Sequence, residues 1–261
     1  NPSLVLIQSD QGKLNLPVSK QKGNPAKIYL LSLYVKNAKV TFIDRKVRAE
    51  GFKTLINNLD IHASKALFPP SSLRINFKST ARFIRPEGDT LGSISFSGWV
   101  DFSRKDMDAK LELADLDVTY FSAYYGDFIS NKKLLSAKLN ATTYFNAKNN
   151  DLKTLTKFRL SDLTYSKEEK DPLGVPCLGL SKKALDLFTD ANGNLNLEFE
   201  FNARFDKPEM TISELQNIIL KSTVKNIASQ DPQDLLEKIT DNIESFKKFG
   251  KELEDIFKNK E

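Results

Sequence analysis

Residues 74–113, RINFKSTARFIRPEGDTLGSISFSGWVDFSRKDMDAKLEL, contain three successive segments in which apolar and polar side chains alternate. In the first segment the odd-numbered positions from Ile75 to Phe83 are apolar except for Ser79, and basic or polar residues stand between them. The same alternation recurs in residues 92–102 and 107–118. Such a repeat is typical of strands, because successive side chains of a strand point to opposite faces. The stretch therefore predicts an antiparallel sheet with one apolar and one polar face.

Further strand-like segments lie on both sides of this stretch. Turn signals are found at Asp10-Gln11-Gly12 and Asn149-Asn150, and a third turn is expected at Lys36-Asn37. The last strand-like segment, NLNLEFEFNARF, ends at Pro208, because proline has no N–H to donate to a neighbouring strand. The expected strands outside the opening stretch are residues 3–10, 12–18, two strands within 27–45, 56–65, 133–148, 152–166 and 194–205.

The C-terminal part of the chain has a helical period. Thr211 and Glu214 match a capping box, and Asp231-Pro232 has the form of a second helix start. Strands first and helices last predict an α+β fold built mainly from antiparallel strands. The expected parts are a sheet domain over residues 1–210, short helices near 119–130 and 181–189, and a helical segment over 211–261.

The last helix carries apolar residues at spacings of three and four, which is the pattern of an amphipathic helix. Packing on the chain's own sheet is the favoured interpretation, because monomers rarely expose so large an apolar patch. Docking onto a partner or onto a second copy is the alternative. The candidate partner-contacting residues are Ile239, Ile243, Phe246, Phe249, Leu253 and Ile256.

Composition excludes several classes of protein. The 261 residues carry a formal net charge of +5, with dispersed basic residues, so nucleic acid is not an expected partner. The single cysteine, Cys177, allows no internal disulfide. No apolar run approaches the roughly 20 residues of a membrane-spanning helix, and no signal peptide is visible. The strand-like start of the sequence leads us to expect a further segment before it.

No arrangement of residues indicates catalysis. His62 is the only histidine, and with Cys177 it forms no recognisable nucleophile site or metal-ligand spacing. The glycine-rich phosphate-binding motifs are also absent, and the scattered glycines Gly88, Gly92 and Gly98 fit turns or close packing. We therefore expect a protein that is not an enzyme and has no cofactor and no metal.

The apolar faces of the strands have two interpretations. They form the closed core of a sandwich or barrel, which periodicity alone favours, or they line the concave side of a curled sheet that binds acyl chains. A lipid tail requires a continuous apolar surface shielded from water. The candidate groove residues are Ile75, Phe77, Phe83, Ile94, Phe96, Val100, Leu111, Leu113, Leu197, Phe199 and Phe201.

The order of several segments resembles the AsmA-like family. In LYVKNAKVTFID, Val40, Phe42 and Asp44 match a strand of the family, and in LADLDVTYFSAYY the matching residues are Asp115, Leu116, Asp117 and Tyr124. Residues 1–16 and 184–219 resemble the early hairpin and the last strand with its helix. The chain departs from the family where Ala123 replaces a proline, and where the Pro-Val and Gly positions of the last strand are replaced. The resemblance is to the branch with a domain of uncharacterised function, related to bridge-like lipid transfer proteins.

This resemblance implies a long curled or twisted sheet that forms a groove or a flattened barrel. It implies a periplasmic location in a Gram-negative envelope, an inner-membrane anchor N-terminal to this sequence, and lipid binding, lipid transport or outer-membrane assembly, with a phospholipid as ligand. The alternative is a structural subunit of an envelope machine, such as a flagellar motor or secretion accessory, that uses the domain for protein contacts. A homo-oligomer is also possible, because a groove of this length would need end-to-end assembly to span a periplasm.

Overall fold

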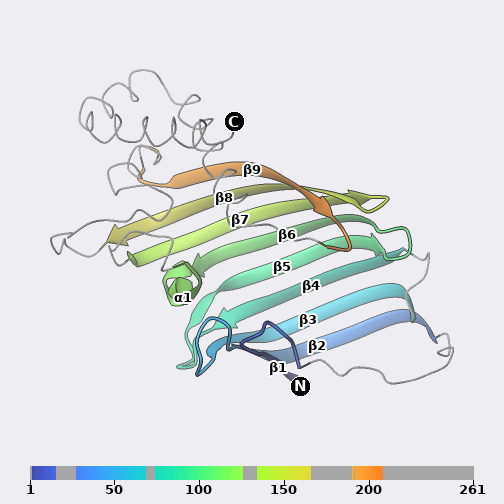
Figure 1. Ribbon diagram of the computed structural model, residues 1–261, viewed down its shortest axis with the longest axis horizontal. Helices are drawn as coiled ribbons and strands as arrows, with labels where there is room; N and C mark the ends of the chain where they lie inside the picture. The colour runs from blue at the N-terminus through green and yellow to red at the C-terminus, as the bar shows by residue number, and fades with distance from the viewer. Residues whose placement is uncertain are drawn as a thin grey trace, which may run out of the picture.

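Nine strands form one sheet in the part of the chain described by the computed structural model, namely residues 2–15, 28–68, 74–125, 134–165, 190 and 192–207. The strands lie side by side in the order in which they occur in the sequence (Figure 1). Their bounds are β1 Ser3–Gln8, β2 Ile28–Asp44, β3 Phe52–Phe68, β4 Ile75–Ile84, β5 Thr90–Asp101, β6 Asp106–Asp117, β7 Leu134–Lys148, β8 Asp151–Tyr165 and β9 Leu195–Arg204.

The expected fold class, mainly antiparallel β with a curled sheet, is confirmed. All neighbouring strands are antiparallel except β1 and β2, which are parallel. The sheet begins with β1 and ends with β9, and these two strands do not pair. The curled sheet is therefore open in the described residues, which corresponds to the expected groove and not to the flattened barrel.

The expected turn at Lys36-Asn37 is wrong, because residues 28–44 form one continuous strand. Asn37 has a φ of 51° and lies in a bulge, where the pairing of β2 with β3 shifts register. The carboxylate of Asp60 accepts a hydrogen bond from the Asn37 N–H at 2.8 Å and holds this conformation. An asparagine with positive φ occurs in both turns and bulges, which explains why the sequence was misread. The turn at Asn149-Asn150 is confirmed, with φ values of 51° and 76°.

Bulges recur near one line across the sheet. Asn58 in β3 and Asp115 in β6 also have φ values of 51°, and the pairing shifts register at both positions. The Asp115 N–H donates to the side chain of Asn140 on β7 at 3.1 Å. Each bulge bends its strand and increases the local twist, so a series of bulges explains why the long sheet curls.

Helical structure in the described residues is confined to the connection after β6. A 3₁₀ turn, η1 Val118–Phe121, is followed by α1 Ser122–Tyr125, and Figure 1 shows this segment lying over one face of the sheet. It falls at the start of the helix expected near 119–130, whose residues 126–130 lie outside the described residues. The helices expected at 181–189 and 211–261, with the six partner-contacting candidates, also lie outside them.

In the described part of the predicted strand 12–18, Leu14 makes a single antiparallel bridge to Gln8. No helix among the described residues has the length and apolar composition needed to cross a membrane.

Candidate apolar groove

Strand pairing puts the apolar positions of β4 to β9 on one face of the sheet. One row of paired residues joins Phe77 on β4 to Phe201 on β9, and the next row joins Ser79 to Phe199. The face is made of four such rows. They are Ile75–Val100–Met107–Ala147–Leu152–Ala203, Phe77–Gly98–Ala109–Phe145–Thr154–Phe201, Ser79–Phe96–Leu111–Thr143–Thr156–Phe199 and Ala81–Ile94–Leu113–Ala141–Phe158–Leu197.

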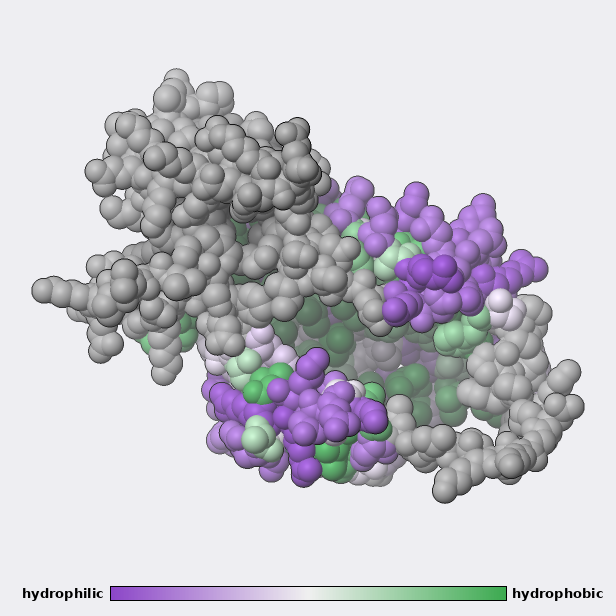
Figure 2. All heavy atoms as spheres, in the orientation of Figure 1, coloured by the Kyte–Doolittle hydropathy of each residue, from purple (hydrophilic) through white to green (hydrophobic). Residues whose placement is uncertain are grey.

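All eleven groove candidates lie on this face. Ten belong to the four rows, and Phe83 extends the face one position further, where it pairs with Gly92. Only Val100 and Leu197 of the eleven are buried, and the other nine are partly exposed. Figure 2 shows hydrophobic residues lining a hollow between hydrophilic surfaces. We call this surface the groove face.

Aromatic rings pack along the groove face without closing it. The ring of Phe96 lies 4.7 Å from that of Phe77 and 5.9 Å from that of Phe145, measured between ring centroids. Gly98 and Ala109 stand between Phe77 and Phe145 in their row and leave room for this ring. A side chain cannot replace Gly98, because a Cβ atom there would lie 2.3 Å from the Asp108 carbonyl oxygen.

Hydroxyl groups on the groove face have hydrogen-bond partners within the sheet. Thr154 donates to the Phe201 carbonyl oxygen at 3.2 Å, and the hydroxyls of Thr143 and Thr156 are 3.1 Å apart. No buried side-chain polar atom of the described residues lacks a partner. The groove face therefore presents mainly apolar atoms to any occupant, because its polar atoms are already satisfied.

An aromatic cluster covers one end of the groove face. The ring of Phe52, at the start of β3, has ring centroids of Tyr120 and Tyr124 at 5.1 and 5.3 Å. Phe121 lies 6.1 Å from both Phe52 and Phe83. Phe52 is 6% exposed, so these contacts form a small closed core. Here η1 and α1 lie over the end of β2, the start of β3 and the end of β4. We call this region the closed end.

Polar contacts hold the helical segment in place at the closed end. The hydroxyl of Tyr124 donates to the buried carboxylate of Asp44 at 3.1 Å, and that of Tyr120 donates to the Lys53 carbonyl oxygen at 2.5 Å. Burial and the bond to Asp44 raise the pKa of Tyr124 far above its usual value. Asp117 accepts the Thr119 N–H and thereby caps η1.

Residues of two separate segments that carry the family resemblance thus meet in space. Asp44 ends β2 and Tyr124 lies in α1, yet their side chains are hydrogen-bonded. Asp117 pairs with Arg85, which follows β4. Asp44 and Asp101 also accept backbone N–H groups of the turns that follow their own strands. The acidic residues of these segments therefore have structural partners.

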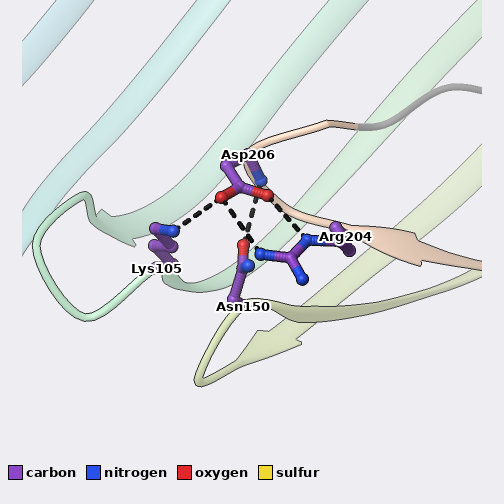
Figure 3. Close-up of polar contacts among 4 residues, drawn as sticks. All are labelled: Lys105, Asn150, Arg204 and Asp206. Carbon is purple, nitrogen blue, oxygen red and sulfur yellow. Dashed lines mark hydrogen bonds and ion pairs between the residues drawn. The ribbon is translucent and has the colours of Figure 1, made fainter.

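A polar clasp joins three connections at the opposite end of the sheet (Figure 3). The carboxylate of Asp206, just after β9, accepts from Lys105 at 2.6 Å and from Arg204 at 3.2 Å. The Asp206 N–H donates to the side chain of Asn150 in the β7–β8 turn. The ring of Phe205 lies 6.2 Å from that of Phe102. The clasp fixes the course of the chain as it leaves β9.

A second hollow lies on the polar face of the described strands. This shallow hollow of about 550 Å³ crosses β6 to β9, but its charged residues include the ion pair of Lys157 with Glu198 at 3.0 Å. His62 stacks on Tyr34 at 4.3 Å between ring centroids. Within the described residues, no group of His, Cys, Asp and Glu side chains is arranged to hold a metal ion.

Sequence reasoning missed two features of the groove. The closed end depends on Phe52 and Phe121, which are far apart in sequence and belong to no repeat of two. The second feature is the exposed apolar segment Tyr29–Val35 of β2, whose apolar residues occupy both faces of the strand. The available signal for it was YLLSLYV, a segment without charge in which Ser32 is the only residue that is neither aliphatic nor aromatic.

No family model, curated protein or solved structure matches the chain. The protein carries a nine-stranded, curled, open sheet in its described residues, with an apolar groove face that is closed at one end by a helical segment.

Proposed function

We propose that the protein is a non-enzymatic envelope protein whose groove face binds the acyl chains of a phospholipid. The observation that carries the proposal is a continuous apolar face in which nine of eleven candidate residues remain partly exposed. A protein interior is packed as densely as an organic crystal, so partly exposed phenylalanines along a whole face indicate surface available to a ligand.

The dimensions and energetics of the groove face suit an acyl chain. Six strands spaced by about 4.8 Å give a row length of roughly 24 Å. This length exceeds half of the roughly 30 Å hydrocarbon core of a bilayer, which is the depth that one acyl chain occupies. Covering apolar surface yields roughly 25 cal/mol per Å², so the groove needs no catalytic or charged group to hold a tail.

The resemblance to AsmA-like proteins supports a location and a role. We propose a periplasmic protein, held at the inner membrane by a segment N-terminal to this sequence, that takes part in lipid transport or in outer-membrane assembly. Closure of one end by Phe52 and Phe121 suits a site that shields a tail from water.

Charged substitutions on β9 test the proposal. Phe199→Glu with Phe201→Glu puts two carboxylates on the groove face and should abolish binding of a fluorescent acyl probe, because an ionised carboxylate is costly to bury beside a lipid tail. Asn202→Glu is the matched control, since it adds a charge to the polar face of the same strand. It should leave probe binding unchanged.

Circular dichroism shows whether a loss of probe binding occurs in a folded or in an unfolded variant. If the double variant keeps the β-sheet signal and loses the probe, the groove proposal is supported. Global unfolding of the double variant would favour an ordinary closed core, and unchanged probe binding would contradict the proposal directly.

A scaffold role is the second candidate, and the exposed apolar segment of β2 favours it. In that role the domain makes protein contacts within an envelope machine. Stoichiometric copurification with a ring-forming envelope complex, together with a lack of bound phospholipid, would support the scaffold over the lipid carrier.

A further inference from the structure

The β2 edge of the sheet is only partly covered. β1 has six residues and pairs with Lys39–Asp44 of β2, whereas β2 has 17 residues. In the described residues, no strand pairs with Ile28–Lys36 on the side of β2 that faces away from β3. The uncovered part is nine residues long, which exceeds the length of an average strand of about five to six residues.

The uncovered part of β2 is apolar and exposed. It contains no charged residue from Ile28 to Val35, and the first charge is Lys36. The exposed fractions of its large side chains are 51% for Tyr29, 73% for Leu31, 38% for Leu33 and 60% for Tyr34. A long, apolar, exposed edge is a template for pairing with another strand, and proteins normally protect such edges.

Other edge positions of this sheet are protected. Asn15 blocks part of the β1 edge, because its side chain accepts from the Ile7 N–H at 2.7 Å and donates to the Val5 carbonyl oxygen at 3.3 Å. The β9 edge carries Glu200 and Arg204, whose charges oppose the approach of an apolar strand. The β1 edge is thus protected by a blocking side chain and the β9 edge by charges, whereas Ile28–Val35 carries no charge and has no such blocking side chain in the described residues.

We propose that this uncovered edge pairs with the same edge of a second copy of the chain, antiparallel about a two-fold axis at Ser32. The segment YLLSLYV is self-complementary in this register. Leu31 then lies opposite Leu33, and Tyr29 lies opposite Val35. In this register Lys36 of one copy lies opposite Ile28 of the other. The two Lys36 residues are therefore eight positions apart along the paired strands, which is roughly 26 Å, and like charges do not meet.

The two-fold axis has a consequence for the groove face. Antiparallel pairing about an axis perpendicular to the sheet keeps the same face of both copies on the same side. Leu31 and Leu33 share the face of Val35, which pairs with Ile61, and Ile61 pairs with Ser79 of the groove face. In the dimer, Leu31 and Leu33 of each copy therefore extend the groove face of the other copy beyond its β2 edge, and the two groove faces become continuous. This consequence rests on the proposed function, whereas the interface itself does not.

A cysteine at the axis tests the register. In a Cys177→Ser background, Ser32→Cys puts two thiols directly opposite each other, at a separation that a disulfide can bridge. Mild oxidation should convert most of this variant to a covalent dimer. Lys36→Cys is the matched control, because its thiols would be too far apart to form a disulfide and the variant should stay uncrosslinked. Equal crosslinking of both variants would indicate random collision and overturn the proposal.

A like-charge pair at the axis tests the dimer itself. Sedimentation of the unmodified chain should show a dimer, and Ser32→Lys should raise its dissociation constant at least tenfold, because identical charges directly opposite each other repel. Thr80→Lys, on the polar face within β4, is the control and should not change the dissociation constant. A monomeric unmodified chain at tens of micromolar would overturn the proposal.

Sedimentation and acyl-probe binding measure the dimer interface and lipid binding independently. Ser32 lies on the polar face, next to Tyr34 and away from the groove face, so Ser32→Lys should still bind an acyl probe. Loss of the dimer with retained probe binding supports the two-fold interface. A dimer that binds no probe would support the interface and count against the groove.

Discussion

The closed end and the open part of the groove face are built from the same residue type in different surroundings. Phe52 is 6% exposed and has the rings of Tyr120, Phe121 and Tyr124 within 6.1 Å. Phe199 lies in the open part, is only partly buried, and has its described ring contact with Phe158 at 6.0 Å.

Phe52 is more buried than Phe199 because a second layer of structure covers the sheet at the closed end. A single sheet shields an apolar side chain from one direction only, so burial requires another element on the same face. At the closed end η1 and α1 supply that layer, fixed by the hydrogen bonds of Tyr120 and Tyr124. Where no described element covers the face, the same apolar pattern leaves side chains partly exposed, and this is the surface that we propose for a lipid tail.

The largest expected effect is the loss of Phe52. Phe52→Ala should lower the free energy of unfolding by about 3–5 kcal/mol, because it leaves a cavity in the closed end. Phe199→Ala is the matched comparison and should cost about 1–2 kcal/mol in the absence of ligand, because its partly exposed side chain leaves a gap open to the groove and not a closed cavity. Urea titrations of both variants measure the difference. Equal costs would mean that the groove face is an ordinary core.

A smaller effect is expected from the hydrogen bond that fastens α1. Tyr124→Phe removes the donor to the Asp44 carboxylate and should destabilise the protein by about 1 kcal/mol. Faster hydrogen exchange should appear in residues 118–125 and not in β9. Uniformly faster exchange would show that the closed end does not open independently of the sheet.

The smallest effect is expected at the clasp, and it depends on pH. The hydrogen bonds from Arg204 and Lys105 hold the pKa of Asp206 far below its usual value of 3.8. Because the folded-state pKa is the lower one, the stabilisation is present above the unfolded pKa of 3.8 and is lost as the pH falls from there through the folded value.

Comparison with Asp206→Asn measures this contribution. The variant should be slightly less stable than the unmodified chain at pH 6, and the difference should shrink below about pH 4. Thermal unfolding across this range is the measurement. A difference that grows as the pH falls would contradict the ion pair as the cause.

The groove face could be predicted from the sequence because it follows from local pattern. Alternation by two assigns each side chain of a strand to one face. Short connections fix the neighbouring strand where they occur, between β4 and β5, β5 and β6, and β7 and β8. Strand pairing then puts Ile75 on β4 and Phe201 on β9 on the same face. Whether that face is covered depends on contacts between distant segments. Phe52 and Tyr120 are an example, and periodicity contains no information about them.

The uncovered edge and the long β2 strand were beyond sequence reasoning for related causes. Asn37 has a positive φ that is compatible with either a turn or a bulge, and only pairing with Asp60 decides between them. The exposure of Leu31 follows from how far the parallel strand β1 extends along β2, and strand alternation does not determine that distance.

Native lipid content tests the central claim most directly. The chain is purified from the cells that produce it under native conditions, and its lipids are extracted and quantified by mass spectrometry. The Phe199→Glu, Phe201→Glu double variant and the Asn202→Glu control are treated in the same way. We predict near-stoichiometric phospholipid on the unmodified chain and the control, and little on the double variant. A folded, unmodified chain that carries no phospholipid would contradict the assignment of the groove face as a lipid site.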